Sequence, residues 1–224
     1  MKAAPLLIYA STLLFGSAIP SFASEVELLF DRGLPTANIN NAAGEKRSNV
    51  VWAANPTVPE QLVGDDFILQ GQAAYTVTKI RVWSTDKEAL SLYAGRDGDT
   101  IKPVSISCNA TRVFYQGQPD TDKDYQGYLG INYYQLYQLD FEVDLTIKGG
   151  ERFDFFLDGP LSPFLHSSNK QRSGSTQKHA DGLLLFFTPS NGQIFASATG
   201  DNGWDKDSDA NVQVFGTQNK PNKK

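Results

Sequence analysis

Hydrophobic and polar residues alternate along much of this chain with the period of two that is typical of a β-strand, and helical periodicity is hard to find. The clearest case is segment 139–145, in which every odd position is apolar and every even position is acidic. A strand separates the two kinds of side chain in this way because its successive side chains point to opposite faces. The pattern therefore predicts a strand with one face in a core and the other in water.

Shorter runs of the same kind recur, separated by glycine, proline, asparagine and aspartate. They predict further strands at Val26–Phe30, Val50–Trp52, Asp66–Leu69, Tyr75–Trp83, Leu90–Ala94, Val104–Ile106, Thr111–Tyr115, Arg152–Leu157, Leu183–Phe187, Gln193–Ser197 and Asn211–Phe215. The even-numbered residues from Thr76 to Val82 are expected to share one face. Long loops are expected at Gln116–Asn132 and Pro160–Ala180, and an acidic loop before the last strand. Many short strands with turn residues between them predict an all-β protein, an antiparallel β-sandwich of jelly-roll-like form.

The N-terminus has the layout of a secretory signal peptide. Lys2 gives a positive start, an apolar run follows over 6–19, and small residues precede a cleavage site after Ala23. The run is shorter than the roughly 20 apolar residues that span a bilayer, which disfavours a membrane anchor. We therefore expect a signal peptide at 1–23, one β-sandwich domain at 24–216, a disordered polar tail at 217–224, and a secreted or periplasmic location.

Composition narrows the classes of partner. The formal net charge is -5 and the basic residues are scattered, which argues against nucleic acid as a partner because that usually requires a basic stripe. No later segment is apolar enough to span a membrane.

Cys108 is the only cysteine, so no internal disulfide stabilises the fold. It is read as a small buried hydrophobe, with an intermolecular bridge or a nucleophile as the alternatives, and Asn109 begins a glycosylation triplet.

Two sets of alternating carboxylates are candidate calcium ligands. They are Asp120, Asp122 and Asp124 in one set, and Asp205, Asp207 and Asp209 in the other. Calcium takes six to eight hard oxygen ligands, and carboxylates on a loop supply them. Neither set has the spacing of an EF-hand, and a solvated acidic loop is the alternative interpretation.

A group of aromatic residues is the candidate ligand-binding surface. Its members are Tyr115, Tyr125, Tyr128, Tyr133 and Trp204, several of them in the expected loop at 116–132. An exposed ring packs on the C–H face of a sugar, and neighbouring carboxylates and amides bind its hydroxyl groups. The group therefore favours a glycan or another cell-surface ligand. The alternative is that these rings belong to the sheets, where tyrosine and tryptophan are common.

The sequence patterns that would indicate catalysis are weaker than those that indicate binding. Asp140, Glu142 and Asp144 share one strand face and resemble the acidic strand of some jelly-roll glycoside hydrolases, although that pattern begins and ends with glutamate. The polar face of an amphipathic strand explains them equally well. The only histidines, His166 and His179, fall in the expected loop at 160–180. The chain contains no nucleophile elbow in its mature part and no zinc-protease motif.

The order of several short motifs resembles a set of exported bacterial β-sandwich proteins. The motifs read "LLFDRGLPTANINN", "GDDFIL", "YTVTKIRVW", "LSLYAG" and, at Trp204–Gly216, "WDKDSDANVQVFG". The resemblance implies an extracytoplasmic jelly-roll-like domain whose relatives mostly lack an assigned activity, and it implies no functional residues. Members often carry a C-terminal sorting anchor, whereas only 217–224 follow here, so a free soluble form is expected.

These observations leave two hypotheses for the function. The first is a secreted, non-catalytic binding or structural module that recognises carbohydrate. The second is a carboxylate-dependent, glycan-active enzyme. They differ in geometry, because an enzyme needs two carboxyl groups that converge in a cleft, whereas a binding module needs exposed rings on a face or rim.

Overall fold

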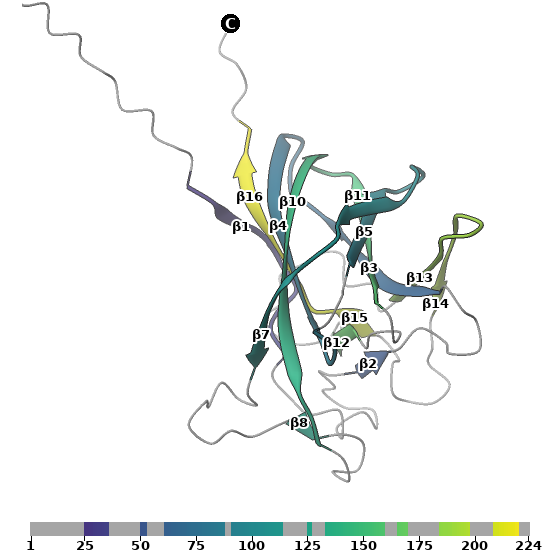
Figure 1. The fold of residues 1–224 in the computed structure, drawn as a ribbon. Coiled ribbons are helices and arrows are strands. Elements are labelled where there is room, and N and C mark those ends of the chain that lie inside the picture. The colour runs from purple at the N-terminus through teal and green to yellow at the C-terminus, as the bar shows by residue number, and fades with distance from the viewer. Residues whose placement is uncertain are drawn as a thin grey trace, which may run out of the picture.

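In the computed structural model the chain forms two antiparallel sheets packed face to face, as predicted (Figure 1). The structure describes residues 25–35, 50–52, 61–87, 91–113, 125–126, 133–159, 165–169, 184–197 and 208–219. Those ranges contain strands and turns and no helix, so none of them holds a helix long and apolar enough to cross a membrane.

The larger sheet has eight strands, and five of them run in the order β1-β16-β4-β10-β7. Their bounds are β1 Glu27–Asp31, β16 Val212–Gln218, β4 Ala74–Ser84, β10 Leu136–Lys148 and β7 Asn109–Val113. Three short strands extend this sheet beside one end of β4: β12 Leu165–Asn169, which pairs with β15 Ser208–Ala210 and with β2 Val50–Trp52.

The second sheet has six strands in the order β14-β13-β3-β11-β5-β6. Their bounds are β14 Gln193–Ser197, β13 Leu184–Thr188, β3 Leu62–Ile68, β11 Arg152–Asp158, β5 Ser91–Arg96 and β6 Lys102–Ser105. A separate two-stranded ribbon pairs β8 Tyr125–Gln126 with β9 Tyr133–Tyr134.

Eight of these strands have the connectivity of a jelly roll. One sheet holds β1, β16, β4 and β10, and the other holds β3, β11, β5 and β6. The chain crosses between the sheets from β3 to β4, from β4 to β5 and from β10 to β11. Strands that follow one another in the sequence therefore often lie in different sheets, as in a jelly roll. The β10–β11 crossing is a tight turn at Gly149–Gly150, where Gly150 has a φ of 85° that glycine adopts without strain.

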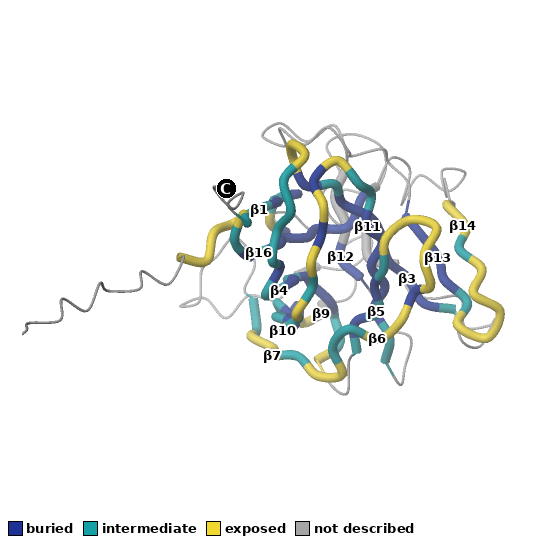
Figure 2. Tube along the Cα trace, turned by 90° about the horizontal axis from the view of Figure 1, so that it is seen from above, coloured by how far each residue is buried: buried dark blue, intermediate teal, exposed yellow. Residues whose placement is uncertain are grey.

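The core lies between the two sheets (Figure 2). Leu139 and Phe141 are fully buried there and the acids between and beyond them face outward, which confirms the predicted strand at 139–145. Phe67 lies at the centre, with its ring 5.6 Å from that of Phe30 and 5.5 Å from that of Phe153. A second apolar cluster around Phe156 lies on the outer face of the smaller sheet, which explains why β11 is buried on both faces.

Four sequence expectations need correction. The register of β4 shifts at Thr78, so Val77 and not Thr76 takes the inward position before Ile80. Opposite β16 the extra residue lies on β4, which identifies a β-bulge at Thr78, and opposite β4 an extra residue lies on β10 between Glu142 and Leu145; no period-two pattern predicts either shift. The expected loop at 160–180 contains the buried strand β12, and the expected acidic loop ends in the strand β15. Ile106, expected in a strand, lies beyond β6 and is 81% exposed.

Candidate functional site

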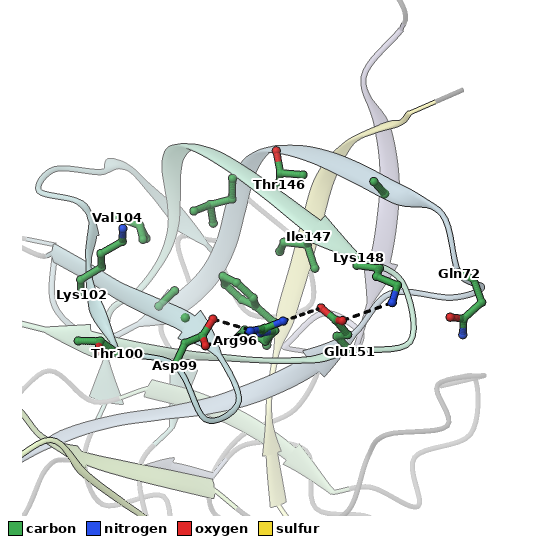
Figure 3. Close-up of a pocket in the computed structure, with 15 residues that line it drawn as sticks. Gln72, Arg96, Asp99, Thr100, Lys102, Val104, Thr146, Ile147, Lys148 and Glu151 are labelled. Atoms are coloured by element: carbon green, nitrogen blue, oxygen red, sulfur yellow. Dashed lines mark hydrogen bonds and ion pairs between the residues drawn. The ribbon is translucent and has the colours of Figure 1, made fainter. Parts of the chain in front are cut away.

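A cleft of about 710 Å³ opens between the two sheets where β10 turns into β11 and β5 turns into β6. We call it the end cleft (Figure 3). Its walls come from both sheets, because β4 and β10 belong to one and β5, β6 and β11 to the other. The two turns that border the cleft are rich in glycine and charge.

The floor of the end cleft is apolar. It consists of Ala94, Val104, Leu145, Ile147 and Phe153. Ala94, Ile147 and Phe153 also belong to the main core, and Val104 and Leu145 pack against it. The floor is therefore the uncovered margin of the core, and a ligand in the cleft would remove apolar surface from water.

Charged side chains form the rim. Figure 3 shows four of them in line, from Lys148 through Glu151 and Arg96 to Asp99. The Glu151 carboxylate lies 3.6 Å from the Lys148 ammonium and 3.7 Å from the Arg96 guanidinium, and Arg96 Nε lies 3.1 Å from Asp99 Oδ2. This chain of ion pairs joins the β10–β11 turn to the β5–β6 turn. Asp99 and Glu151 both favour the protonated form of Arg96 and raise its pKa.

Lys102 is a fifth charge on the rim, and it is exposed. Within the described part of the chain it has no ion-pair partner, unlike Arg96 and Lys148. Three cations and two carboxylates therefore line the cleft, and the surplus positive charge is at Lys102. The cleft can bind an anionic group there.

A second set of charges, most of them buried, lies around β3 and β11, and we call it the buried ionic cluster. It consists of Arg32, Asp65, Asp66, Arg152, Asp154 and Asp209. Arg32 Nη1 lies 2.8 Å from Asp65 Oδ2, and Arg32 Nη2 donates to the backbone carbonyl of Asp66 at 2.6 Å. The backbone N–H of Ala210 donates to Asp65 as well. The cluster thus ties the end of β1 to β3 and to β15.

Asn211 and His166 extend this network. The Asn211 amide donates to the backbone carbonyl of Gly33 at 3.1 Å, and its Oδ1 lies 2.9 Å from His166 Nδ1. The backbone N–H of Asn211 donates to the carbonyl of His166 at 3.0 Å. His166 is fully buried in β12, and the contacts with Asn211 join it to the fold.

Carboxylates outnumber cations in the buried ionic cluster, and their pKa values reflect this. Burial raises the pKa of Asp65 well above its ordinary value despite the opposing charge of Arg32, and Asp209 and Asp66 add to the rise. Burial likewise raises the pKa of Asp154 to about 6, against the attraction of Arg152. Asp154 Oδ2 is buried and has no hydrogen-bond partner among the described residues. Burial thus moves both carboxyl groups toward their protonated form.

The three acids of β10 are placed as a polar strand face. Asp140 makes a bidentate pair with Arg81, at 2.6 and 2.8 Å, and lies 3.7 Å from Lys79. Glu142 and Asp144 are exposed on the outward face. Asp140 and Glu142 border a hollow of about 270 Å³ with Cys108, whose thiol pKa is raised by burial. Cys108 is half-buried and packs against the core, in keeping with its reading as a small hydrophobe.

The structure describes few of the predicted ligand-binding and calcium residues. Outside the described residues lie Tyr115, Tyr128, Trp204, Asp120, Asp122, Asp124, Asp205 and Asp207. The backbones of Tyr125 and Tyr133 lie in the β8–β9 ribbon, where Tyr125 pairs with Tyr134. Glycan binding by these aromatic residues stays a prediction.

Asp209 is the one predicted calcium ligand whose side chain is described. It is 1% exposed in β15, and its charge stabilises that of Arg32, so in this structure it belongs to the buried ionic cluster. Among the described residues no group of three histidine, cysteine or acidic side chains is arranged to hold a metal ion. Calcium binding by the two sets stays a prediction, since their other five members are not described.

Sequence reasoning missed both the end cleft and the buried ionic cluster. The motifs "LLFDRGLP", "GDDFIL" and "DANVQVFG" contribute Arg32, the Asp65–Asp66 pair and Asp209, so adjacent acids before an aromatic residue were the available signal. The cleft had no such signal, because its residues come from turns 50 positions apart. No protein-family model matches the chain, and comparisons with curated proteins and with solved structures found no significant match.

Proposed function

We propose that this protein is an exported, non-catalytic binding module that takes its ligand in the end cleft. The observation that carries the proposal is the form of the cleft, an apolar floor continuous with the core beneath a rim of ion-paired side chains. Its volume is within the range of about 300–1,000 Å³ that is common for ligand sites. The signal-like N-terminus supports export.

The charges of the cleft favour binding over hydrolysis of glycans. A glycoside hydrolase needs one carboxyl group that holds a proton and a second that acts on the other side of the bond. Asp99 and Glu151 are the carboxylates that line the cleft, and both are ion-paired with the same guanidinium of Arg96 on the rim, so they do not face each other across the cleft as an unpaired couple. On β10, Asp140 is held by Arg81 in the same way.

A matched pair of rim variants tests the proposal. Thr100 lines the cleft and Asp97 lies in the same turn but not on the cleft, and both are exposed. The labelled protein is applied to a glycan array and to a peptide array. We expect Thr100→Trp to weaken binding of any captured probe by about tenfold, the effect of losing roughly 1.4 kcal/mol of contacts, and Asp97→Trp to leave it unchanged.

The measurement can contradict the proposal in three ways. Equal binding by the two variants would place the ligand site outside the end cleft. Conversion of a captured probe to a product, detected by mass spectrometry, would show that the protein is an enzyme. Failure to capture any probe on either array would count against a binding module.

A further inference from the structure

One edge of the larger sheet is uncovered beside the end cleft. Strand β10 pairs with β4 on one side as far as Lys148. On its other side β7 pairs only with Leu136–Asp140. Within the described residues, no strand covers that second side of β10 from Phe141 to Lys148. Alternate residues there direct their backbone N–H and C=O groups away from the sheet, where a further strand would pair.

This uncovered edge faces the end cleft. Four consecutive residues of β10, Leu145 to Lys148, line it. Successive side chains of a strand point to opposite faces, so a cavity over one face touches alternate residues only. We read the contact with all four as a cleft that reaches the edge of the strand.

The opposite wall is also a strand edge. Strand β6 ends the smaller sheet, and it pairs with β5 on one side only. Lys102 and Val104, which are two apart on β6 and so share a face, line the cleft. A segment between the walls would therefore have backbone partners on β10 and side-chain contacts from β6.

The lining favours an extended polypeptide over a sugar. Sugar sites use an exposed ring face, and Phe153, the aromatic residue among the described lining residues, is only 7% exposed. Backbone groups on an open strand edge are the usual acceptor for a strand added from a partner. The positive charge at Lys102 is complementary to an acidic side chain on that strand.

We propose that the end cleft accepts an extended polypeptide segment of a partner, which adds a strand to the β10 edge and places an acidic side chain against Lys102. This inference rests on the proposed function, since it names the ligand class of the same cleft. The apolar side chains of the segment would cover Leu145 and Val104. Specificity would come from the acidic position and from these apolar contacts.

The experiment uses a displayed library of random ten-residue peptides, panned against the purified protein. The best-captured peptide is synthesised in two N-methylated forms, one methylated at its odd and the other at its even residues. Alternate residues of an added strand direct their N–H groups toward the acceptor. We therefore expect one form to lose binding by at least about tenfold and the other to keep it.

Charge reversal tests the role of Lys102. We expect Lys102→Glu to weaken binding of the unmodified peptide by about tenfold, and a peptide whose acidic residue is replaced by lysine to regain it. Lys87→Glu is the control, since Lys87 is exposed beyond the far end of β4, where it lies 5.4 Å from the Tyr137 ring centroid, and does not line the cleft. Both variants should fold, because each changes an exposed side chain, and circular dichroism checks this.

Each outcome bears on the proposal. Equal binding of both N-methylated forms, or no effect of Lys102→Glu, would overturn strand addition. Capture on a glycan array without capture of any peptide would overturn this inference while the binding function stands, and failure of both probes would overturn the two together. If the protein self-associates and Lys102→Glu abolishes this, the occupant of the cleft is a second copy of the chain, and the proposal of a partner's segment is overturned.

Discussion

The buried ionic cluster and the rim of the end cleft contain the same residue types, arginine and aspartate, in opposite environments. Arg32 and Asp65 are each 1% exposed, whereas Arg96 and Asp99 are 53% and 51% exposed. Two buried charges lose their hydration and are costly unless each stays paired, so the cluster requires its partners to remain in place. Exposed pairs in water contribute little to stability and exchange partners easily. The first arrangement suits a structural junction and the second a surface that binds.

The largest effect is expected from breaking the buried arrangement. Arg32→Met leaves Asp65, Asp66 and Asp209 without the guanidinium between them, and removal of one partner of a buried ion pair typically costs about 3–5 kcal/mol. Urea denaturation of the purified protein measures the free energy of unfolding. A loss below about 1 kcal/mol would show that the cluster behaves like a surface network and would remove the contrast.

A medium effect is expected from pH. The pKa of Asp154 is about 6 in the folded protein against 3.8 ordinarily, so between these values the folded state keeps a proton that the unfolded state releases. The free energy of unfolding therefore falls as pH rises through this window, by up to about 3 kcal/mol. Asp65 acts in the same direction.

Urea denaturation at several pH values from about 4 to about 7 measures this slope, because that range covers the interval between the unfolded and folded pKa values of Asp154. Asp154→Asn should flatten it, because the amide does not titrate, and Asp144→Asn, at an exposed position of β10 that does not influence Asp154, is the control. An unchanged slope in Asp154→Asn would mean that Asp154 is ionised in the folded protein throughout.

The smallest effect is expected at the rim. Arg96→Met removes the two ion pairs that Arg96 makes with Asp99 and Glu151, and exposed pairs of this kind contribute little to stability. The difference in the free energy of unfolding from the wild type should vanish in about 1 M NaCl, which screens exposed charges. A loss as large as that of Arg32→Met, or one that salt leaves unchanged, would show that the rim is part of the structural core.

The sequence by itself determined the fold class. Alternation over 139–145 predicts β10, and local turn residues mark the ends of most other strands, because period-two burial and turn conformations are short-range properties. The strand β12 escaped prediction because it contains one apolar residue, Leu165, followed by four polar residues, which is no period-two pattern. The bulge at Thr78 escaped because a register shift depends on the neighbouring strands.

Only the tertiary structure decided which charges are structural and which are available for binding. The sequence shows Asp65, Asp99 and Asp209 as similar acids near turns or aromatic residues. Jelly-roll crossings bring two of them to Arg32 in the interior and leave the third on the rim of the end cleft. Whether a carboxylate stabilises the fold or faces a ligand depends on its burial and on partners distant in the chain, and neither is a local property of the sequence.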